Sequence, residues 1–103
     1  MWVLRADGLP DKPDGKTFRL SDGSVKTVGR ATRADFIVDA PLVSRVHCRL
    51  TADQSGQLIV EDLGSTNGTR VNGRRVTRAV AKAGDELGVG KVVIRVERHA
   101  GSD

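Results

Sequence analysis

The chain has 103 residues, of which 38% are hydrophobic and 29% charged, and its formal net charge is +4 at pH 7. This length suits a single domain with one modest core. No apolar run approaches the roughly 18 residues of a membrane-spanning helix, so we expect no membrane partner, and residues 1–7 lack the basic and long apolar regions of a signal peptide.

The numbers of cysteines and aromatic residues exclude further classes of protein. Cys48 is the only cysteine, so we expect no intrachain disulfide and no cysteine-based metal cluster, and a reducing, cytoplasmic setting is favoured. One tryptophan, two phenylalanines and no tyrosine are too few for the aromatic platforms that stack single-stranded nucleic acid. The sequence pI of about 9.8 nevertheless keeps a basic nucleic-acid-binding domain open as an alternative.

The first predicted elements are short strands separated by turns. Short β-type runs at residues 2–5 and 17–20 flank a turn-rich segment, and a third run follows at residues 26–29. Residues 48–52 alternate apolar and polar positions, which is the period of a half-buried strand. A turn then joins them to residues 57–62, which predicts a hairpin.

The C-terminal part continues this pattern. Val92, Ile94 and Val96 alternate with other residues, as in a half-buried strand, whereas residues 78–82 contain alanines that suit a helix but form too short a segment to be stable alone. Many short strands separated by turns predict an all-β antiparallel sandwich. We expect the domain to cover residues 1–98 and residues 99–103 to be a frayed tail.

The most informative segment is residues 65–69, Ser-Thr-Asn-Gly-Thr. Asn67-Gly68 predicts a tight turn, because both residue types tolerate a positive φ. Upstream lie two further motifs, Ser44-Arg45-Val46-His47 and Gly29-Arg30. Together these segments supply a guanidinium, several hydroxyls and an amide at predicted strand ends. That inventory suits a bound phosphate, since it offers many donors and no carboxylate base beside a nucleophile.

In chain order, the sequence carries Gly29-Arg30, then Ser44-Arg45-Val46-His47, then residues 62–69 (Asp-Leu-Gly-Ser-Thr-Asn-Gly-Thr), then Val71-Asn72-Gly73 and residues 84–90. This succession resembles the motifs of the forkhead-associated (FHA) domain. The resemblance covers roughly residues 2–98. It implies an eleven-stranded β-sandwich that binds phosphothreonine peptides through loops at one end. It also implies a signalling adaptor downstream of a Ser/Thr kinase, not an enzyme, with no cofactor. The implied partner is a phosphothreonine-containing protein, either a kinase substrate or the kinase itself.

The resemblance assigns roles residue by residue. Arg30 and Ser44 are expected to contact phosphate oxygens, Thr66 to lie beside the phosphothreonine, and Asn67 to hold the peptide backbone. A side-chain contact of Arg45 with the ligand stays open. Structural roles are expected for the remaining motif residues: Gly29, His47, Gly64, Gly68, Asn72 and Gly73. Among these, His47 is expected to be a buried residue that ties the binding loops together, and the glycines to adopt conformations that a Cβ would forbid.

Two further alternatives stay open. Ser44 and His47 are the two residue types of a serine hydrolase, for which Asp39 and Asp62 are available but unmarked carboxylates. The second alternative is an FHA domain that binds its partner without phosphorylation. The sequence predicts no metal site.

Overall fold

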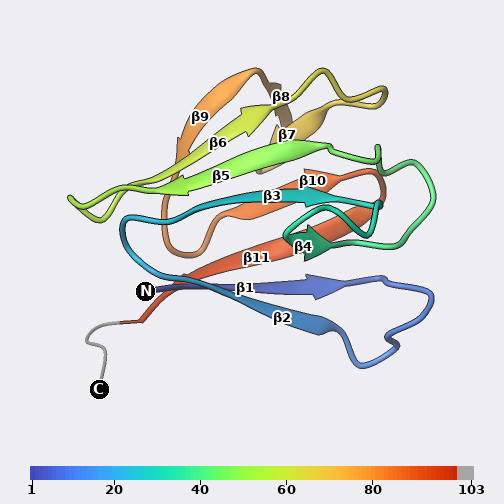
Figure 1. Ribbon diagram of the computed structural model, residues 1–103, viewed down its shortest axis with the longest axis horizontal. Coiled ribbons are helices and arrows are strands. Elements are labelled where there is room, and N and C mark those ends of the chain that lie inside the picture. Colours follow the sequence, from blue (N-terminus) through green and yellow to red (C-terminus); the bar gives the residue numbers. More distant parts are fainter. Residues whose placement is uncertain (100–103) are drawn as a thin grey trace.

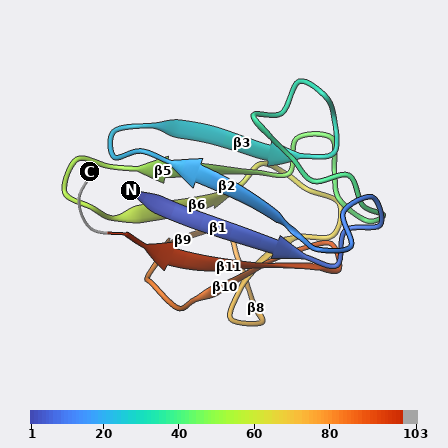
Figure 2. The same ribbon diagram turned by 90° about the horizontal axis from the view of Figure 1, so that it is seen from below.

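The computed structural model describes residues 1–99, which form eleven strands and no helix. The strands lie in two sheets, shown from two directions in Figures 1 and 2. One has six strands in the order β2-β1-β11-β10-β7-β8, and the other has five in the order β4-β3-β5-β6-β9. The strands are β1 Trp2–Asp7, β2 Lys16–Leu20, β3 Val25–Gly29, β4 Phe36–Ile37, β5 Cys48–Ala52, β6 Leu58–Asp62, β7 Thr69–Val71, β8 Arg74–Val76, β9 Arg78–Ala81, β10 Glu86–Val89 and β11 Val92–Arg98. The predicted eleven-stranded sandwich is confirmed.

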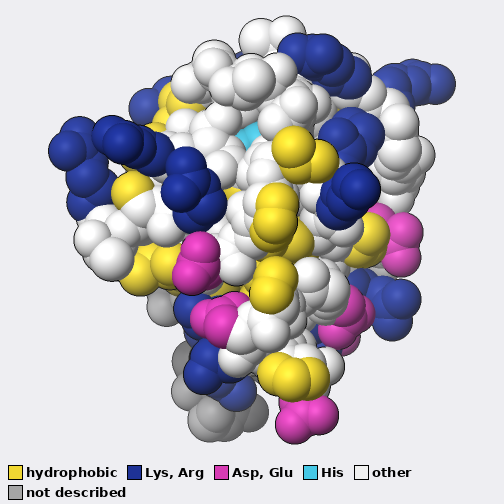
Figure 3. Space-filling model, turned by 90° about the vertical axis from the view of Figure 1, so that its right-hand side faces the viewer, with side chains coloured by type: hydrophobic (Ala, Val, Ile, Leu, Met, Phe, Trp, Pro, Cys, Tyr) yellow, Lys and Arg dark blue, Asp and Glu magenta, His cyan; other side chains and the backbone are white. Residues whose placement is uncertain are grey.

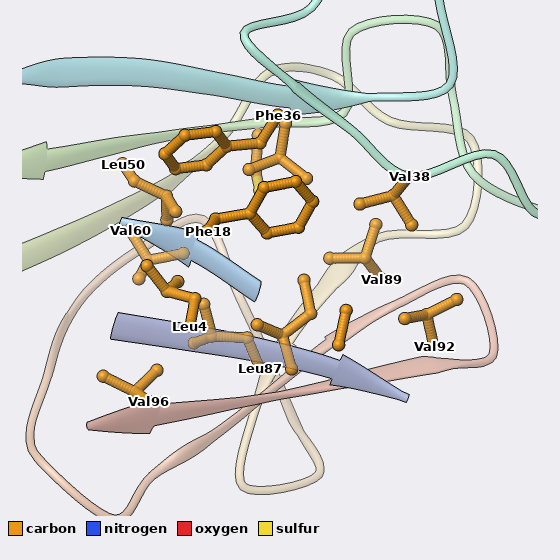
Figure 4. Close-up of a cluster of buried hydrophobic side chains, with 14 of the residues drawn as sticks. Leu4, Phe18, Phe36, Val38, Leu50, Val60, Leu87, Val89, Val92 and Val96 are labelled. Atoms are coloured by element: carbon orange, nitrogen blue, oxygen red, sulfur yellow. The ribbon is translucent and has the colours of Figure 1, made fainter. Parts of the chain in front are cut away.

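The core lies between the two sheets (Figure 4). The alternation predicted for the last strand is present, because Val92, Ile94 and Val96 are buried in β11. Phe18 and Phe36 stack with their ring centroids 4.7 Å apart and join β2 to β4 across the sandwich. Full burial of each large apolar side chain contributes about 1.5–3 kcal/mol, so the core holds the framework on which the loops are mounted.

Two strands go beyond the sequence prediction, which gave residues 78–82 no firm assignment. Arg78–Ala81, whose alanines suit a helix, is strand β9; it pairs antiparallel with β6, which satisfies backbone groups that so short a helix would leave open. Strand β4 pairs parallel with β3 and is the exception to the otherwise antiparallel pairing of residues 1–99. Both differences arise from tertiary pairing, which local residue preferences do not reveal.

The two Asn-Gly pairs form different turns. Asn72 and Gly73 have φ angles of 52° and 82° and form the two-residue loop of the β7–β8 hairpin. Gly68 also has a positive φ, of 82°, but Asn67-Gly68 lies in the segment between β6 and β7, which belong to different sheets. This second turn therefore carries the chain from one sheet to the other.

The first and last described residues, Met1 and His99, pair at the end of the β1–β11 ladder. The backbone N–H of His99 donates to the Met1 carbonyl at 2.9 Å, so His99 continues the ladder rather than leaving it. The rest of the predicted frayed tail, residues 100–103, lies outside the described residues. Within residues 1–99, no helix is long and apolar enough to cross a membrane.

Candidate functional site

Loops at one end of the sandwich bring the sequence motifs together, at the right-hand end of Figure 1. They enclose a surface hollow of about 610 Å³, here called the first hollow. Its lining residues come from the loops after β1, β3, β4 and β6: Pro10, Asp11, Arg30, Asp39, Ala40, Pro41, Leu42, Val43, Ser44, Thr66 and Asn67. Four residues predicted to contact a phosphopeptide, Arg30, Ser44, Thr66 and Asn67, thus share one hollow.

Arg30 is the one cation among the described residues that line the first hollow. Its backbone N–H donates to the Ser44 carbonyl at 3.0 Å, and its side-chain Nε donates to the Val43 carbonyl at 3.0 Å. The preceding Gly29 makes this approach possible, because a Cβ there would collide with the Arg45 carbonyl. Within residues 1–99, no hydrogen bond or ion pair engages the two terminal NH₂ groups of Arg30. The guanidinium is therefore positioned by its inner nitrogen, with its outer edge available.

His47 connects two of the loops from a fully buried position. The Ser44 backbone N–H donates to His47 Nδ1 at 3.1 Å, and Nε2 lies 2.8 Å from the Gly68 carbonyl oxygen. Because Nδ1 accepts, Nε2 must carry the proton and donate to Gly68. His47 therefore links the loop after β4 to the loop after β6, the geometry expected of a scaffold residue.

Two further hydrogen bonds join the same loops at the hollow itself. Ser44 Oγ accepts the backbone N–H of Thr66 at 3.1 Å, and Asn67 Nδ2 donates to the Leu42 carbonyl at 3.0 Å. Leu42 adopts a φ of 71°, which is uncommon for a branched residue, and leaves 49% of its surface exposed. The Asn67 amide thus holds the backbone of Leu42 in an uncommon conformation with its side chain exposed, as is typical of residues at ligand-binding surfaces.

Asp62, the last residue of β6, holds the β6–β7 loop in place through hydrogen bonds. Its carboxylate accepts from the hydroxyls of Ser65 and Thr69, the latter at 2.8 Å, and from the backbone N–H of Gly64 at 3.1 Å. Partial burial raises the pKa of Asp62, but the hydrogen bonds from Ser65 and Thr69 outweigh it, and the net pKa is lowered. The carboxylate thus stays charged and fixes the turn that carries Thr66 and Asn67.

The remaining motif residues do not line the first hollow. Arg45 is exposed and lines a neighbouring hollow of about 440 Å³, the second hollow, formed by Arg30, Ala31, Thr32, Arg33, Arg45 and Val46. Asn72 accepts the backbone N–H of Glu86 at 2.9 Å and so ties the β7–β8 turn to the start of β10. Gly64 has a φ of 72°, as expected of a position that disfavours a Cβ.

The geometry speaks against a Ser44–His47 hydrolase. Nδ1 of His47 accepts from the Ser44 backbone, not its hydroxyl, and Nε2 is engaged by Gly68. Neither ring nitrogen can therefore take a proton from Ser44 Oγ. Asp62 hydrogen-bonds Ser65 and Thr69 instead of orienting the imidazole.

Cys48 shows no reactive character. The side chain is fully buried, and this burial raises the pKa of its thiol to about 12. It packs as a small apolar residue in β5.

Sequence reasoning missed Pro10 and Asp11, which line the first hollow from the loop between β1 and β2. Their segment was identifiable only as turn-rich. The structure places this loop beside the β4–β5 segment, in agreement with both ribbon views. No local signal could have revealed that contact, because it depends on how β1 and β2 sit in the six-stranded sheet.

Figure 3 views the loop end directly. Apolar side chains run down its middle and basic side chains gather on either side. The first hollow contributes the apolar residues Ala40, Pro41, Leu42 and Val43 to this end. The arrangement therefore combines an apolar strip with flanking positive charge.

Comparison with known proteins agrees with this geometry. Residues 26–90 match the family model of the FHA domain. The glycogen accumulation regulator GarA of Mycolicibacterium smegmatis is 37% identical over 79 residues, which make up 77% of this chain and 49% of that protein. The chain thus spans about half the length of the curated relatives it matches.

Solved structures share the fold. The FHA domain of the Chlamydia trachomatis protein CT664 superposes with a TM-score of 0.87 at 25% identity, covering 96% of this chain and 98% of that one. A structure described as an analysis of phosphothreonine-dependent FHA domain interactions gives a TM-score of 0.83 at 32% identity, covering 95% and 96%. FHA domains are binding modules, which confirms the prediction of a binding module rather than an enzyme. By its motifs, its fold and the match over residues 26–90, the chain belongs to the FHA domain family.

Proposed function

We propose that this FHA domain binds phosphothreonine in a peptide segment of a partner protein, with the phosphate in the first hollow. The observation that carries the proposal is the unengaged outer edge of the Arg30 guanidinium beside the Ser44 hydroxyl. A phosphothreonine carries about −1.5 to −2 charges at pH 7 and three acceptor oxygens. A fixed guanidinium with neutral donors around it matches that ligand.

Four of the lining residues have a specific role in this proposal. Arg30 presents its terminal NH₂ groups to two phosphate oxygens. Ser44 Oγ accepts from Thr66, which directs its own proton outward as a donor. Asn67 uses one amide N–H to hold Leu42, and its second N–H and its oxygen remain for the peptide backbone. Thr66 lies at the exposed rim, next to the phosphothreonine side chain.

The relatives support a regulatory role. The solved structure that is 32% identical to this chain is described as an analysis of phosphothreonine-dependent FHA domain interactions, and the relative GarA is named a regulator. We infer that the chain is a cytoplasmic adaptor module that recognises a substrate of a Ser/Thr kinase, or the kinase itself. Its domain is taken as residues 1–98, and Gly29, His47, Gly64, Gly68, Asn72 and Gly73 are assigned structural roles.

A phosphothreonine peptide library, screened beside its unphosphorylated counterpart, tests this function. We expect enrichment only of phosphorylated peptides. Equal binding of both libraries would instead identify a phospho-independent interaction domain. A basic nucleic-acid binder would show phosphopeptide-independent binding to nucleic acid that weakens steeply with salt.

A further inference from the structure

The second hollow is a basic surface beside the proposed phosphate site. Three of its lining residues are arginines, Arg30, Arg33 and Arg45, and all three are exposed. Arg30 lines both hollows and is the one residue they share. A ligand anchored at Arg30 is therefore in reach of both hollows.

The backbone around the second hollow is fixed by hydrogen bonds. Ala31 N–H donates to the Arg45 carbonyl at 3.1 Å, which holds the loop after β3 against the loop after β4. Ala34 N–H donates to the Ala31 carbonyl at 3.0 Å and closes a turn that contains Arg33. Arg33 and Arg45 thus line one hollow from two loops whose backbones are hydrogen-bonded to each other.

No carboxylate among the described residues neutralises this arginine group. Asp or Glu side chains are absent from the lining of the second hollow, and none of the ion pairs within residues 1–99 includes Arg30, Arg33 or Arg45. Asp35, which follows in the same loop, is engaged elsewhere: its carboxylate accepts from the backbone N–H of Thr27 at 2.9 Å and from the Thr27 hydroxyl at 3.1 Å. The positive charge is therefore left for a ligand.

The first hollow has the opposite character away from Arg30. Its lining includes two acidic residues, Asp11 and Asp39, together with an apolar strip. An acidic group in the ligand would be repelled on that side and attracted on the side of Arg33 and Arg45. The two flanks of the bound phosphate are thus electrostatically unequal.

We propose that the second hollow binds a second anionic group of the same phosphopeptide, either a carboxylate or a second phosphate. The inference rests on the proposed function, because Arg30 must first hold the phosphothreonine. An extended peptide advances about 3.3 Å per residue, so four positions on either side of the phosphothreonine reach about 13 Å from it, and we expect the second anion within that reach on one flank only. The pair of arginines then selects partners by charge pattern as well as by phosphothreonine.

The test is a titration series on one phosphothreonine peptide. Aspartate or phosphoserine replaces a neutral residue at each of four positions on either side, and a peptide with only the second phosphate controls for a shifted register. We expect tighter binding on one flank, by about threefold for aspartate and about tenfold for phosphoserine at low salt. The gain should shrink as salt rises. A gain with aspartate identifies acidic residues as sufficient, and a gain confined to phosphoserine identifies a doubly phosphorylated partner.

The variant Arg33→Gln assigns the gain to the second hollow, because Arg33 lines that hollow and not the first. We expect it to lose most of the gain while binding the singly phosphorylated peptide as before, with an unchanged melting temperature. Arg19→Gln is the matched control, an exposed arginine on β2 outside both hollows, and it should keep the gain. An absent gain, or a gain that survives in full in Arg33→Gln, overturns the inference alone. Failure of the native domain to bind the singly phosphorylated peptide overturns the proposed function itself.

Discussion

Replacing His47 with alanine should destabilise the domain before it affects ligand binding. The substitution removes two hydrogen bonds, from Ser44 N–H at 3.1 Å and to the Gly68 carbonyl at 2.8 Å, from a fully buried position. Each polar group left without a partner in the interior costs about 1–3 kcal/mol. The Ser44 N–H and the Gly68 carbonyl are two such groups, so a loss of about 2–6 kcal/mol is expected, a large part of the roughly 5–15 kcal/mol that stabilises a typical domain.

Thermal unfolding measures this effect. At about 4–8 °C per kcal/mol for a domain of this size, the melting temperature of His47→Ala should fall by at least about 8 °C. The affinity for phosphopeptide, measured well below that temperature, should fall less than in an Arg30 variant. His99→Ala, at the exposed end of β11, is the matched control and should melt like the native domain. If affinity collapsed with no change in melting, His47 would have to be placed in the binding site.

Three further predictions follow from the site and from one surface ion pair. A matched phosphoserine peptide should bind with an affinity at least about fourfold lower than that of the phosphothreonine peptide, because the buried threonine methyl contributes about 0.8 kcal/mol or more. Equal affinities in a titration would exclude a methyl pocket beside Asn67. The FHA resemblance implies that the domain reads the third residue after the phosphothreonine, and a peptide with isoleucine there should bind more tightly than one with aspartate. The first hollow offers apolar Pro41, Leu42 and Val43 beside acidic Asp11 and Asp39, and Arg70 already donates to the Gly90 carbonyl. Tighter binding of the aspartate peptide that fades with salt would instead place an arginine at that position. The hydrogen bond from Arg98 lowers the pKa of Asp22 from 3.8 to about 2, so the stabilisation by Asp22 is present above pH 3.8 and is lost as the pH falls towards 2. The melting temperatures of the native domain and of Asp22→Asn should therefore differ near pH 6 and converge near pH 2. A difference that stays constant with pH would contradict this prediction.

Alternation and turn residues were sufficient to predict most of the framework. The β5–β6 hairpin and the alternating β11 follow from period-two burial, and Asn72-Gly73 forms the tight turn that its residue types favour. The strand at Arg78–Ala81 was harder to predict, because its alanines suit a helix and only the pairing with β6 makes it a strand. Phe36–Ile37 has only two residues, too few to show any period.

The site was predictable only in part for a similar reason. Arg30, Ser44, Thr66 and Asn67 stand in recognisable motifs, and the fold brings them around one hollow. The division of the arginines between two hollows has no local signature: Arg45 is adjacent to Ser44 in sequence but lies with Arg33 in the second hollow. Likewise, the contact of Pro10 and Asp11 with the first hollow depends on the packing of whole sheets.

The most direct test of the account is calorimetric titration of one phosphothreonine peptide into the native domain and into Arg30→Ala. Hydrogen bonds to charged groups contribute about 1.5–3 kcal/mol, so we predict a loss of affinity of about tenfold to a hundredfold. The melting temperature should stay nearly constant, because Arg30 is exposed and its one side-chain hydrogen bond within residues 1–99 is to the Val43 carbonyl. An Arg30→Ala domain that binds the peptide as tightly as the native one would contradict the proposed phosphate site.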